Sequence, residues 1–165
     1  DESGRALFYL VNDAYDQLYE YSPLTDRQIE YYIDQYLDLL DLDLVTIIVD
    51  EEEKLVGVGI SMPSMSRALQ KAKGKLFPFG WIPLLKGLKG KNDRVDLLRV
   101  AVKPEYQSKG VNALLFQDLI PYYIKRGFKW AESNPEMETN AKVQSQWDYF
   151  THRQHRRRRS YVKNI

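Results

Sequence analysis

The chain has 165 residues, enough for one domain with a substantial core, since a domain of this size hides roughly two-thirds of the surface that its unfolded chain exposes. It contains no cysteine and only two histidines, which excludes disulfide bonds and cysteine nucleophiles and argues against a structural zinc site, and we expect no metal-binding residues. No apolar run approaches the ~20 residues that span a bilayer and no signal-peptide pattern opens the chain, so we expect a soluble cytoplasmic protein.

Charge is distributed unevenly along the sequence. Residues 1–54 carry 15 acidic and 3 basic side chains, whereas residues 55–165 carry 8 acidic and 21 basic ones. A basic half favours a phosphate-bearing ligand, a nucleic acid or an anionic membrane, and equally an acidic half packed beside it. Because the chain opens with Asp1 rather than Met, we interpret it as a fragment that lacks an upstream strand or domain.

Apolar residues at helical spacing predict two amphipathic helices, over residues 3–20 and 25–40, and Thr25 with Gln28 fits a capping box for the second. The period then changes to two. Residues 44–50 and 54–62 are predicted to form an antiparallel hairpin. The second strand leaves one face almost bare, which indicates either the close approach of another backbone or a ligand, or a bulge. The bare positions are Gly57, Gly59 and Ser61.

Residues 63–92 interrupt this rhythm and are interpreted as an insertion or lid. The segment is rich in lysine, glycine, proline and large apolar residues. Such a stretch can touch an anionic membrane or cover an apolar substrate, but its composition favours packing of the large side chains onto the domain. The side chains concerned are Phe77, Phe79, Trp81, Ile82 and Leu84.

The remaining elements complete an α/β domain. A long strand over residues 94–104 leads through a polar loop to a helix that we expect to end at Gly127. The pattern then predicts a strand over 128–133, a helix over 139–153 and a final exposed strand over 157–164. With no linker or repeat in the sequence, we expect residues 1–165 to form a single domain.

The polar loop before the long helix has the character of an anion site. The first amides of a helix lack intrahelical partners and lie at the positive end of the helix dipole. Gly110 lets a ligand approach closely and Lys109 adds positive charge, so the amides from Gln107 to Asn112 can surround a diphosphate. A plain turn is the alternative interpretation of a single glycine at this place.

The stretch VAVKPEYQSKGVNALL, with Val102, Pro104, Gln107 and Gly110 in register, resembles the acetyl-CoA signature of the GCN5-related N-acetyltransferase (GNAT) superfamily. NAKVQSQWDYF, from Asn140, looks like a second motif on the CoA side. The resemblance implies a central mixed, mostly antiparallel sheet flanked by helices, with the family's first strand missing. It also implies that the loop amides hold the CoA pyrophosphate and that the preceding strand bonds the pantetheine arm. The cofactor-binding residues expected on this basis are Val100, Val102, Gln107, Ser108, Lys109, Gly110, Val111, Asn112 and Asn140.

Two positions depart from the family pattern. Asn112 stands where the pattern has Gly or Ala, and it either crowds the phosphate loop or adds a donor to it. Trp147 stands where the pattern has the tyrosine that protonates the departing thiolate, and an indole is not an acid at ordinary pH. Tyr149 is two residues further on and is the remaining candidate for that role.

Acyl transfer to an amine requires a base, for which we name Glu132 and Asp96, although a salt bridge is the commoner use of either. Backbone amides near Val100 and Val102 are candidates for an oxyanion hole. The sequence therefore predicts an acyltransferase that uses acetyl-CoA or a longer acyl-CoA and an unidentified amine or other nucleophile. The alternatives are a catalytically degenerate binding module, a domain that attaches to membrane lipid through residues 75–91, and RNA binding by the basic run His152–Arg159.

Overall fold

The computed structural model describes residues 2–17, 21–36 and 40–163, and the chain divides into two compact units, Asp1–Asn134 and Pro135–Ile165. In the first unit the helices are α1 (Glu2–Tyr15), α2 (Asp26–Tyr36), α3 (Ser66–Ala72), α4 (Trp81–Lys89) and α5 (Val111–Lys125), and the strands are β1 (Val45–Val49), β2 (Leu55–Pro63), β3 (Arg94–Val102) and β4 (Trp130–Ser133). The second unit contains α6 (Ala141–Ser145). Within the part of the chain that the structure describes, no helix has the length and apolarity to cross a membrane.

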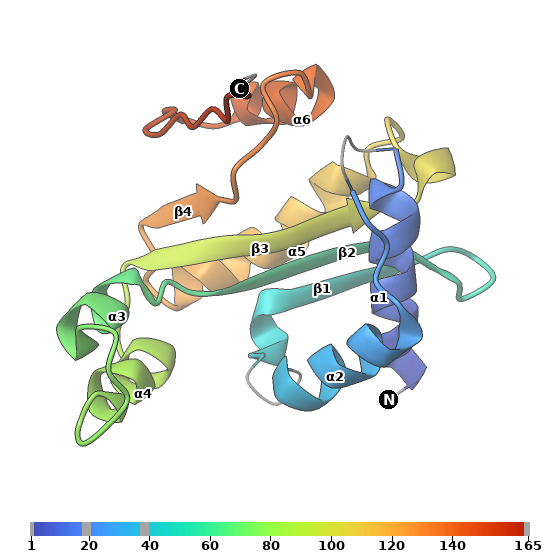
Figure 1. Ribbon diagram of the computed structural model, residues 1–165. Helices are drawn as coiled ribbons and strands as arrows, with labels where there is room; N and C mark the ends of the chain where they lie inside the picture. The colour runs from blue at the N-terminus through green and yellow to red at the C-terminus, as the bar shows by residue number, and fades with distance from the viewer. Residues whose placement is uncertain (1, 18–20, 37–39, 164–165) are drawn as a thin grey trace. The chain divides into compact units, whose positions relative to one another are not determined.

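The four strands form one mixed sheet in the order β1-β2-β3-β4 (Figure 1). The predicted hairpin is confirmed, because β1 pairs antiparallel with β2, and β2 pairs antiparallel with β3. The pair β3 and β4 is parallel. The register between β2 and β3 shifts between Ile60 and Ser61, which leaves Leu98 as an extra residue on β3. This bulge bends the strand at the point where its pairing with β4 has just ended.

Helix α5 covers the bare face of β2. A Cβ atom built on Gly57 would lie 2.9 Å from Cγ1 of Val111, and one built on Gly59 would lie 3.1 Å from Cδ1 of Leu119. At the next position on this face, Ser61 accepts a hydrogen bond of 2.9 Å from the Tyr123 hydroxyl. The close approach expected from the sequence is therefore that of the chain's own helix, and the small side chains of β2 fix how near α5 lies.

The opposite face of the sheet is covered by α1. Its buried residues Leu7, Leu10 and Val11 pack on Val58 and Ile60 of β2. Helix α2 follows and begins with the predicted capping box. The backbone N–H of Thr25 donates to the Gln28 side chain at 2.9 Å, and the Gln28 N–H donates to the Thr25 hydroxyl at 3.4 Å. The last residues of both predicted helices, 18–20 and 37–39, lie outside the described residues.

Two predictions for the C-terminal segment are wrong. The helix expected over 139–153 is α6, which ends at Ser145 and tightens into a 3-10 turn, Gln146–Tyr149. The strand expected over 157–164 does not form in its described part, 157–163. A strand needs a neighbour, and among the described residues of the second unit none provides one. Two arginines of the run, Arg157 and Arg159, lie instead beside the carboxylate of Glu138 at 3.9 and 3.2 Å.

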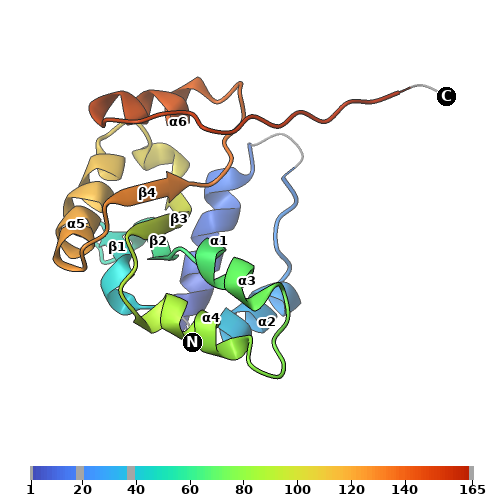
Figure 2. The ribbon, with the colours of Figure 1, turned by 90° about the vertical axis from the view of Figure 1, so that its left-hand side faces the viewer.

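The segment 63–92 contains two helices that lie side by side (Figure 2). The packing predicted for its large side chains is wrong for most of them, because Phe77 and Phe79 are 77% and 70% exposed and Trp81 and Ile82 are exposed as well. Only Leu84 is partly buried. Helix α4 packs on α3 through its small residue Gly87, which leaves Trp81 and Ile82 on its exposed side. Phe77 and Phe79 lie before the helix, in the exposed loop 73–79.

Candidate functional site

Strand β3 has two neighbours over its first half and one over its second. Its pairing with β4 runs from Arg94 to Leu97 and stops there, while its pairing with β2 continues to Val102. Strand β4 ends at Ser133, and Pro135, two residues on, has no N–H to donate. An edge of β3 therefore opens beyond Leu97.

Side chains donate hydrogen bonds to the backbone carbonyl groups along this open edge. The Tyr15 hydroxyl donates to the carbonyl of Val100 at 2.7 Å, and the Gln107 amide donates to the carbonyl of Val102 at 3.1 Å. The Asn134 amide donates to the carbonyl of Leu98. Each of these three acceptors thus has a side-chain partner in place of a strand.

The N–H groups of Val100 and Val102 point to the same open edge. The N–H of Lys103 donates to the carbonyl of Val56 on β2 at 2.9 Å, and N–H directions alternate along a strand. Val102 and Val100 therefore direct their N–H groups away from β2. These two donors are suited to the carbonyl oxygens of an extended ligand.

The loop at the end of β3 has two residues in the left-handed region. Ser108 has φ 64° and Gly110 has φ 83°. Left-handed residues of this kind occur in anion-binding nests. The N–H groups of Gln107 and Lys109, predicted from the sequence to be anion donors, are used within the loop, where they donate to the carbonyls of Lys103 and Tyr106 at 3.1 and 3.4 Å. The Lys109 ammonium lies 5.2 Å from the centre of the Tyr106 ring, and Gln107 braces the loop against β3. The loop combines positive charge, donors and exposure.

Helix α5 starts directly at this loop. A Cβ on Gly110 would meet nothing within 4 Å, so the glycine is required by its φ and leaves open space in front of the first turn. Gly127, just past the C-terminus of α5, has φ 78° and the same open surroundings. Val111 is buried against Gly57, so its side chain is structural and only its backbone faces the loop. Asn112 is exposed in the first turn.

The two predicted bases lie beside one another on the neighbouring strands β3 and β4. Asp96 and Glu132 are register partners of the parallel pair. Burial, together with the charge of Glu132, raises the pKa of Asp96, while a hydrogen bond with Ser64 and the charge of Arg94 oppose the rise. Among the described residues, Oδ1 of Asp96 is buried and has no hydrogen-bond partner. A partly buried carboxylate with an unused oxygen is suited to accepting a proton.

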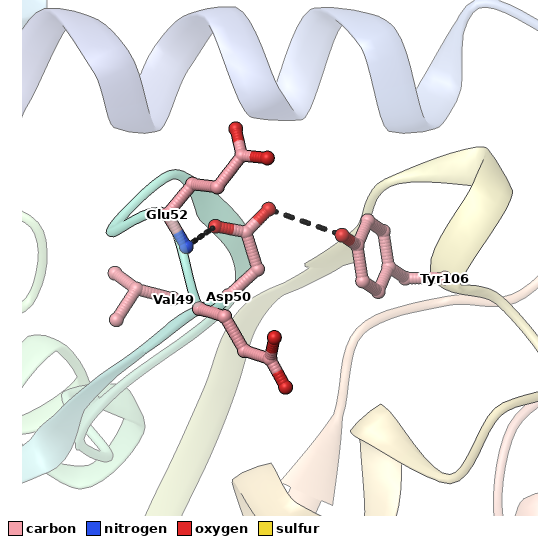
Figure 3. Close-up of a pocket in the computed structure, with 5 residues that line it drawn as sticks. Val49, Asp50, Glu52 and Tyr106 are labelled. Carbon is pink, nitrogen blue, oxygen red and sulfur yellow. Dashed lines mark hydrogen bonds between the residues drawn. The ribbon is translucent and has the colours of Figure 1, made fainter.

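A surface hollow of about 630 Å³ lies at the tip of the β1–β2 hairpin, beside the segment that follows β3 (Figure 3). It is lined by Val49, Asp50, Glu51, Glu52 and Tyr106. The Tyr106 hydroxyl donates to Asp50 at 3.0 Å, and Asp50 also accepts from the N–H groups of Glu52 and Lys54. These bonds lower the pKa of Asp50, the bond from Lys54 most. Because three carboxylates repel a diphosphate, the hollow itself is not suited to the anion. The hydrogen bond from Tyr106 to Asp50 instead joins the segment before the loop to the hairpin.

The remaining predicted site residues belong to the second unit and are described within it alone. The side chain of Asn140 caps α6 by accepting from the Val143 N–H at 3.3 Å. The Trp147 indole donates to both oxygens of Glu136, at 2.8 and 3.0 Å. Tyr149 is 90% exposed. Asn140 and Trp147 thus have clear structural uses inside this unit.

Residues 7–144 match the sequence pattern of the acetyltransferase (GNAT) family. The match takes in well over half of the chain, so the chain belongs to the GNAT acetyltransferase family. The mixed α/β fold expected from the sequence is confirmed. Membership of this family supports acyl transfer as the general chemistry of the domain.

Two curated relatives are longer than this chain. The bacterial ceramide synthase of Caulobacter vibrioides is 29% identical over 113 residues, which cover 67% of this chain and 29% of that protein. Protein YghO of Escherichia coli is 25% identical over 171 residues, which cover 99% of this chain and 43% of that protein. The chain spans less than half the length of these relatives.

Solved structures show the same fold at low identity. An acetyltransferase from Trypanosoma brucei is 16% identical with a TM-score of 0.54, covering 99% of this chain and 95% of that one. A ribosomal-protein-alanine N-acetyltransferase from Brucella melitensis biovar Abortus is 13% identical with a TM-score of 0.53, covering 99% and 93%. The aminoglycoside acetyltransferase AAC(6')-Iy, in complex with a CoA-based bisubstrate analogue, is 12% identical with a TM-score of 0.58, covering 100% and 94%.

Sequence reasoning named the loop and both carboxylates as candidates and did not name Tyr15, Ser64 or Asn134, which the structure shows beside them. Tyr15 lies 85 positions before Val100, on an ordinary amphipathic helix, and no local pattern distinguishes it from the other tyrosines of α1 and α2. Asn134 carried a weak signal, because an Asn-Pro pair after a strand indicates a place where pairing stops.

Proposed function

We propose that this chain is the acyltransferase domain of a longer enzyme, which binds an acyl-CoA along the open edge of β3 and transfers the acyl group to an amine. One observation carries the proposal. Strand β3 parts from β4 after Leu97, so the N–H groups of Val100 and Val102 are directed to an edge that runs straight into the loop Ser108–Gly110.

The loop supports binding of the diphosphate of CoA. Ser108 and Gly110 have the left-handed backbone conformation that occurs in anion-binding nests, Lys109 supplies charge, and no atom lies within 4 Å of where a Cβ on Gly110 would be. The pantetheine arm carries amide groups of its own, which match the donors on the open edge of β3. Acyl-CoA is therefore a chemically suitable co-substrate for these residues.

The proposed reaction is direct attack. The amine lone pair adds to the thioester carbonyl carbon, and the N–H of Val100 donates to the oxygen as it gains negative charge. The N–H of Val102, about 7 Å along the strand and nearer the loop, is left for an amide carbonyl of the pantetheine arm. The carbon–sulfur bond then breaks. The proton lost by the ammonium passes to Asp96, directly or through water, while the departing thiolate takes a proton from water. Glu132 acts on Asp96 through its charge.

The acyl group and acceptor are proposed from the relative named a bacterial ceramide synthase. Ceramide is the amide that forms when a fatty acyl group is joined to the nitrogen of a long-chain amine. A long-chain acyl-CoA and a lipid-like amine are therefore the first substrates to test beside acetyl-CoA. The Trp147 position favours a second candidate, a GNAT-fold module that binds CoA without efficient turnover, because an indole cannot protonate the thiolate.

Calorimetric titration with acetyl-CoA and with palmitoyl-CoA tests the proposal. The variant is Gly110→Leu, and Gly127→Leu is its matched control, because both glycines have positive φ and open surroundings while only Gly110 lies in the loop. Saturable binding that is lost in Gly110→Leu alone supports a diphosphate site. Absence of binding to both ligands in the unaltered chain contradicts the proposal. Binding with no release of CoA thiol in the presence of any amine favours the binding module.

A further inference from the structure

Helix α4 shows an unusual distribution of side chains. It packs on α3 through Gly87, where an added Cβ would lie 2.8 Å from Cβ of Ala68 and 3.3 Å from Sδ of Met65. With about 100° between successive residues, one arc of the helix gathers its exposed side chains. The exposed residues on this arc are Trp81, Ile82, Leu85, Lys86 and Lys89. The apolar side chains of this arc therefore face solvent rather than the core.

The loop before α4 adds to this surface. Residues 73–79 are all exposed, and they include Leu76, Phe77 and Phe79 with exposed fractions of 52%, 77% and 70%. The Trp81 indole donates to the carbonyl of Pro78 at 3.1 Å, which ties the loop to the start of the helix. We call the two parts together the tip surface. Its large apolar residues are Leu76, Phe77, Phe79, Trp81, Ile82 and Leu85.

The tip surface is also strongly basic. Residues 63–92 contain six lysines and one arginine and no acidic residue, whereas the whole chain is nearly neutral with a net charge of +1. Arg67 is paired with Asp93, outside the segment, at 2.9 Å. The lysines are Lys71, Lys73, Lys75, Lys86, Lys89 and Lys91. Large exposed apolar residues with lysines beside them and no acid among them are the composition of surfaces that lie in a membrane interface.

We propose that the tip surface docks this domain on a bilayer that contains anionic lipids. Phe77, Phe79 and Trp81 enter the boundary between headgroups and acyl chains, and the lysines lie against the lipid phosphates. A lipid surface is favoured over an acidic protein because Leu76, Phe77 and Phe79 lie within a run of seven consecutive exposed residues, 73–79. A protein partner would have to offer a hollow of matching shape, whereas lipid does not. The proposal goes beyond acyl transfer and does not rest on it.

Co-sedimentation with vesicles tests the docking. The chain is mixed with phosphatidylcholine vesicles and with vesicles that also contain phosphatidylserine. We expect binding to the anionic vesicles only, lost at high salt. Lys86→Gln combined with Lys89→Gln is expected to lower the partition coefficient roughly tenfold or more. Phe77→Ser combined with Phe79→Ser is expected to lower it similarly at low salt, because the acyl-chain contacts are removed.

The matched control addresses the other basic region. A variant with Arg156→Gln, Arg157→Gln, Arg158→Gln and Arg159→Gln removes four charges outside the tip surface and is expected to leave most of the binding in place. Loss of binding in this control, with full binding by the lysine variant, overturns the proposal. Equal binding to neutral vesicles also overturns it. A dimer in sedimentation velocity that Phe77→Ser with Phe79→Ser dissociates, without vesicle binding, assigns the surface to a second copy of the chain instead.

A fluorescence measurement gives an independent readout at the tip. With Trp130→Phe and Trp147→Phe, Trp81 is the remaining indole of the three in the sequence. We expect its emission to shift to shorter wavelength with anionic vesicles and to be quenched by brominated lipids. Emission that stays unchanged while the protein sediments with the vesicles shows that another surface binds, and contradicts the proposal.

Discussion

The two halves of β3 differ although they belong to one continuous strand. Over Arg94–Leu97 the strand is flanked by β2 and β4, and Asp96 faces Glu132. Over Leu98–Val102 it is flanked by β2 and by three side chains, those of the sequence-distant Tyr15 and Asn134 and that of Gln107 in the loop that follows the strand. The first half holds two partly buried carboxyl groups, and the second directs two backbone N–H groups away from β2.

The difference shows how a strand edge is kept available for a ligand. An unpaired edge invites another strand, because its N–H and C=O groups are both open. Here the carbonyls of Leu98, Val100 and Val102 already have partners, so a full ladder cannot form without displacing them. The N–H groups of Val100 and Val102 point away from β2, toward the open edge. The edge is thus selective for a ligand that brings acceptors, which is our reason for assigning it to acyl-CoA.

The largest expected effect lies in the paired half. Asp96→Asn is expected to lower kcat/KM by roughly 100-fold or more, because it removes the proposed base. In the unaltered chain, kcat/KM is expected to rise with pH through the pKa of Asp96, which burial holds above its usual value. Glu132→Gln is expected to move this acidic limb to lower pH, since the charge of Glu132 contributes to raising that pKa. A pH–rate profile with no limb, or one that survives in Asp96→Asn, excludes Asp96 as the base.

The second effect lies at the end of the open half. Gly110→Leu is expected to weaken acyl-CoA binding by roughly 100-fold, because the new side chain fills the space before α5 and the residue resists positive φ. Gly127→Leu is expected to cost about 1–2 kcal/mol of stability by the same φ effect and to leave binding unchanged. Calorimetric titration measures the loss of binding, and thermal unfolding measures the loss of stability, in each variant. Similar loss of binding in both variants indicates damage to α5 as a whole.

A smaller effect is expected at the carbonyl of Val100. Tyr15→Phe removes the 2.7 Å hydrogen bond to that carbonyl and leaves the ring in place. We expect a loss of about 1 kcal/mol of stability and a drop in kcat/KM of roughly tenfold, with little change in affinity for CoA. Tyr15→Phe is thus expected to lower kcat/KM with affinity nearly unchanged, whereas Gly110→Leu is expected to lower the affinity itself. Unchanged kcat/KM in a variant that has lost the stability shows that Tyr15 is purely structural.

The smallest effect is on the pH dependence of folding. Because the folded-state pKa of Asp96 is raised, the folded state holds that proton more tightly than the unfolded chain does. Asp96 therefore lowers the free energy of unfolding as pH rises from the ordinary aspartate value through the raised one. The difference in urea stability between the chain and Asp96→Asn is expected to change in that window and to be flat outside it. A difference that is flat throughout means that the carboxyl is not perturbed.

Local sequence patterns predicted correctly those features that depend on residues close together in the chain. The Thr25–Gln28 capping box, the hairpin around Asp50 and the helix end at Gly127 depend on neighbours within a few positions, and all were predicted correctly. The strand over 157–164 and the packing of residues 77–82 failed, because both required partners elsewhere in the chain. A β-branched or aromatic residue predicts a half-buried surface, and the sequence does not say whether that surface will find a cover.

By itself the sequence determined the class of fold and the position of the loop, since Pro104, Gln107 and Gly110 act through the backbone of their own segment. Tertiary structure alone decided where β3 leaves β4, that Tyr15 reaches Val100, and that Asp96 is buried opposite Glu132. These features depend on groups tens of residues apart in the chain. Their energies arise from burial and from direction in space, which residue spacing along the chain does not encode.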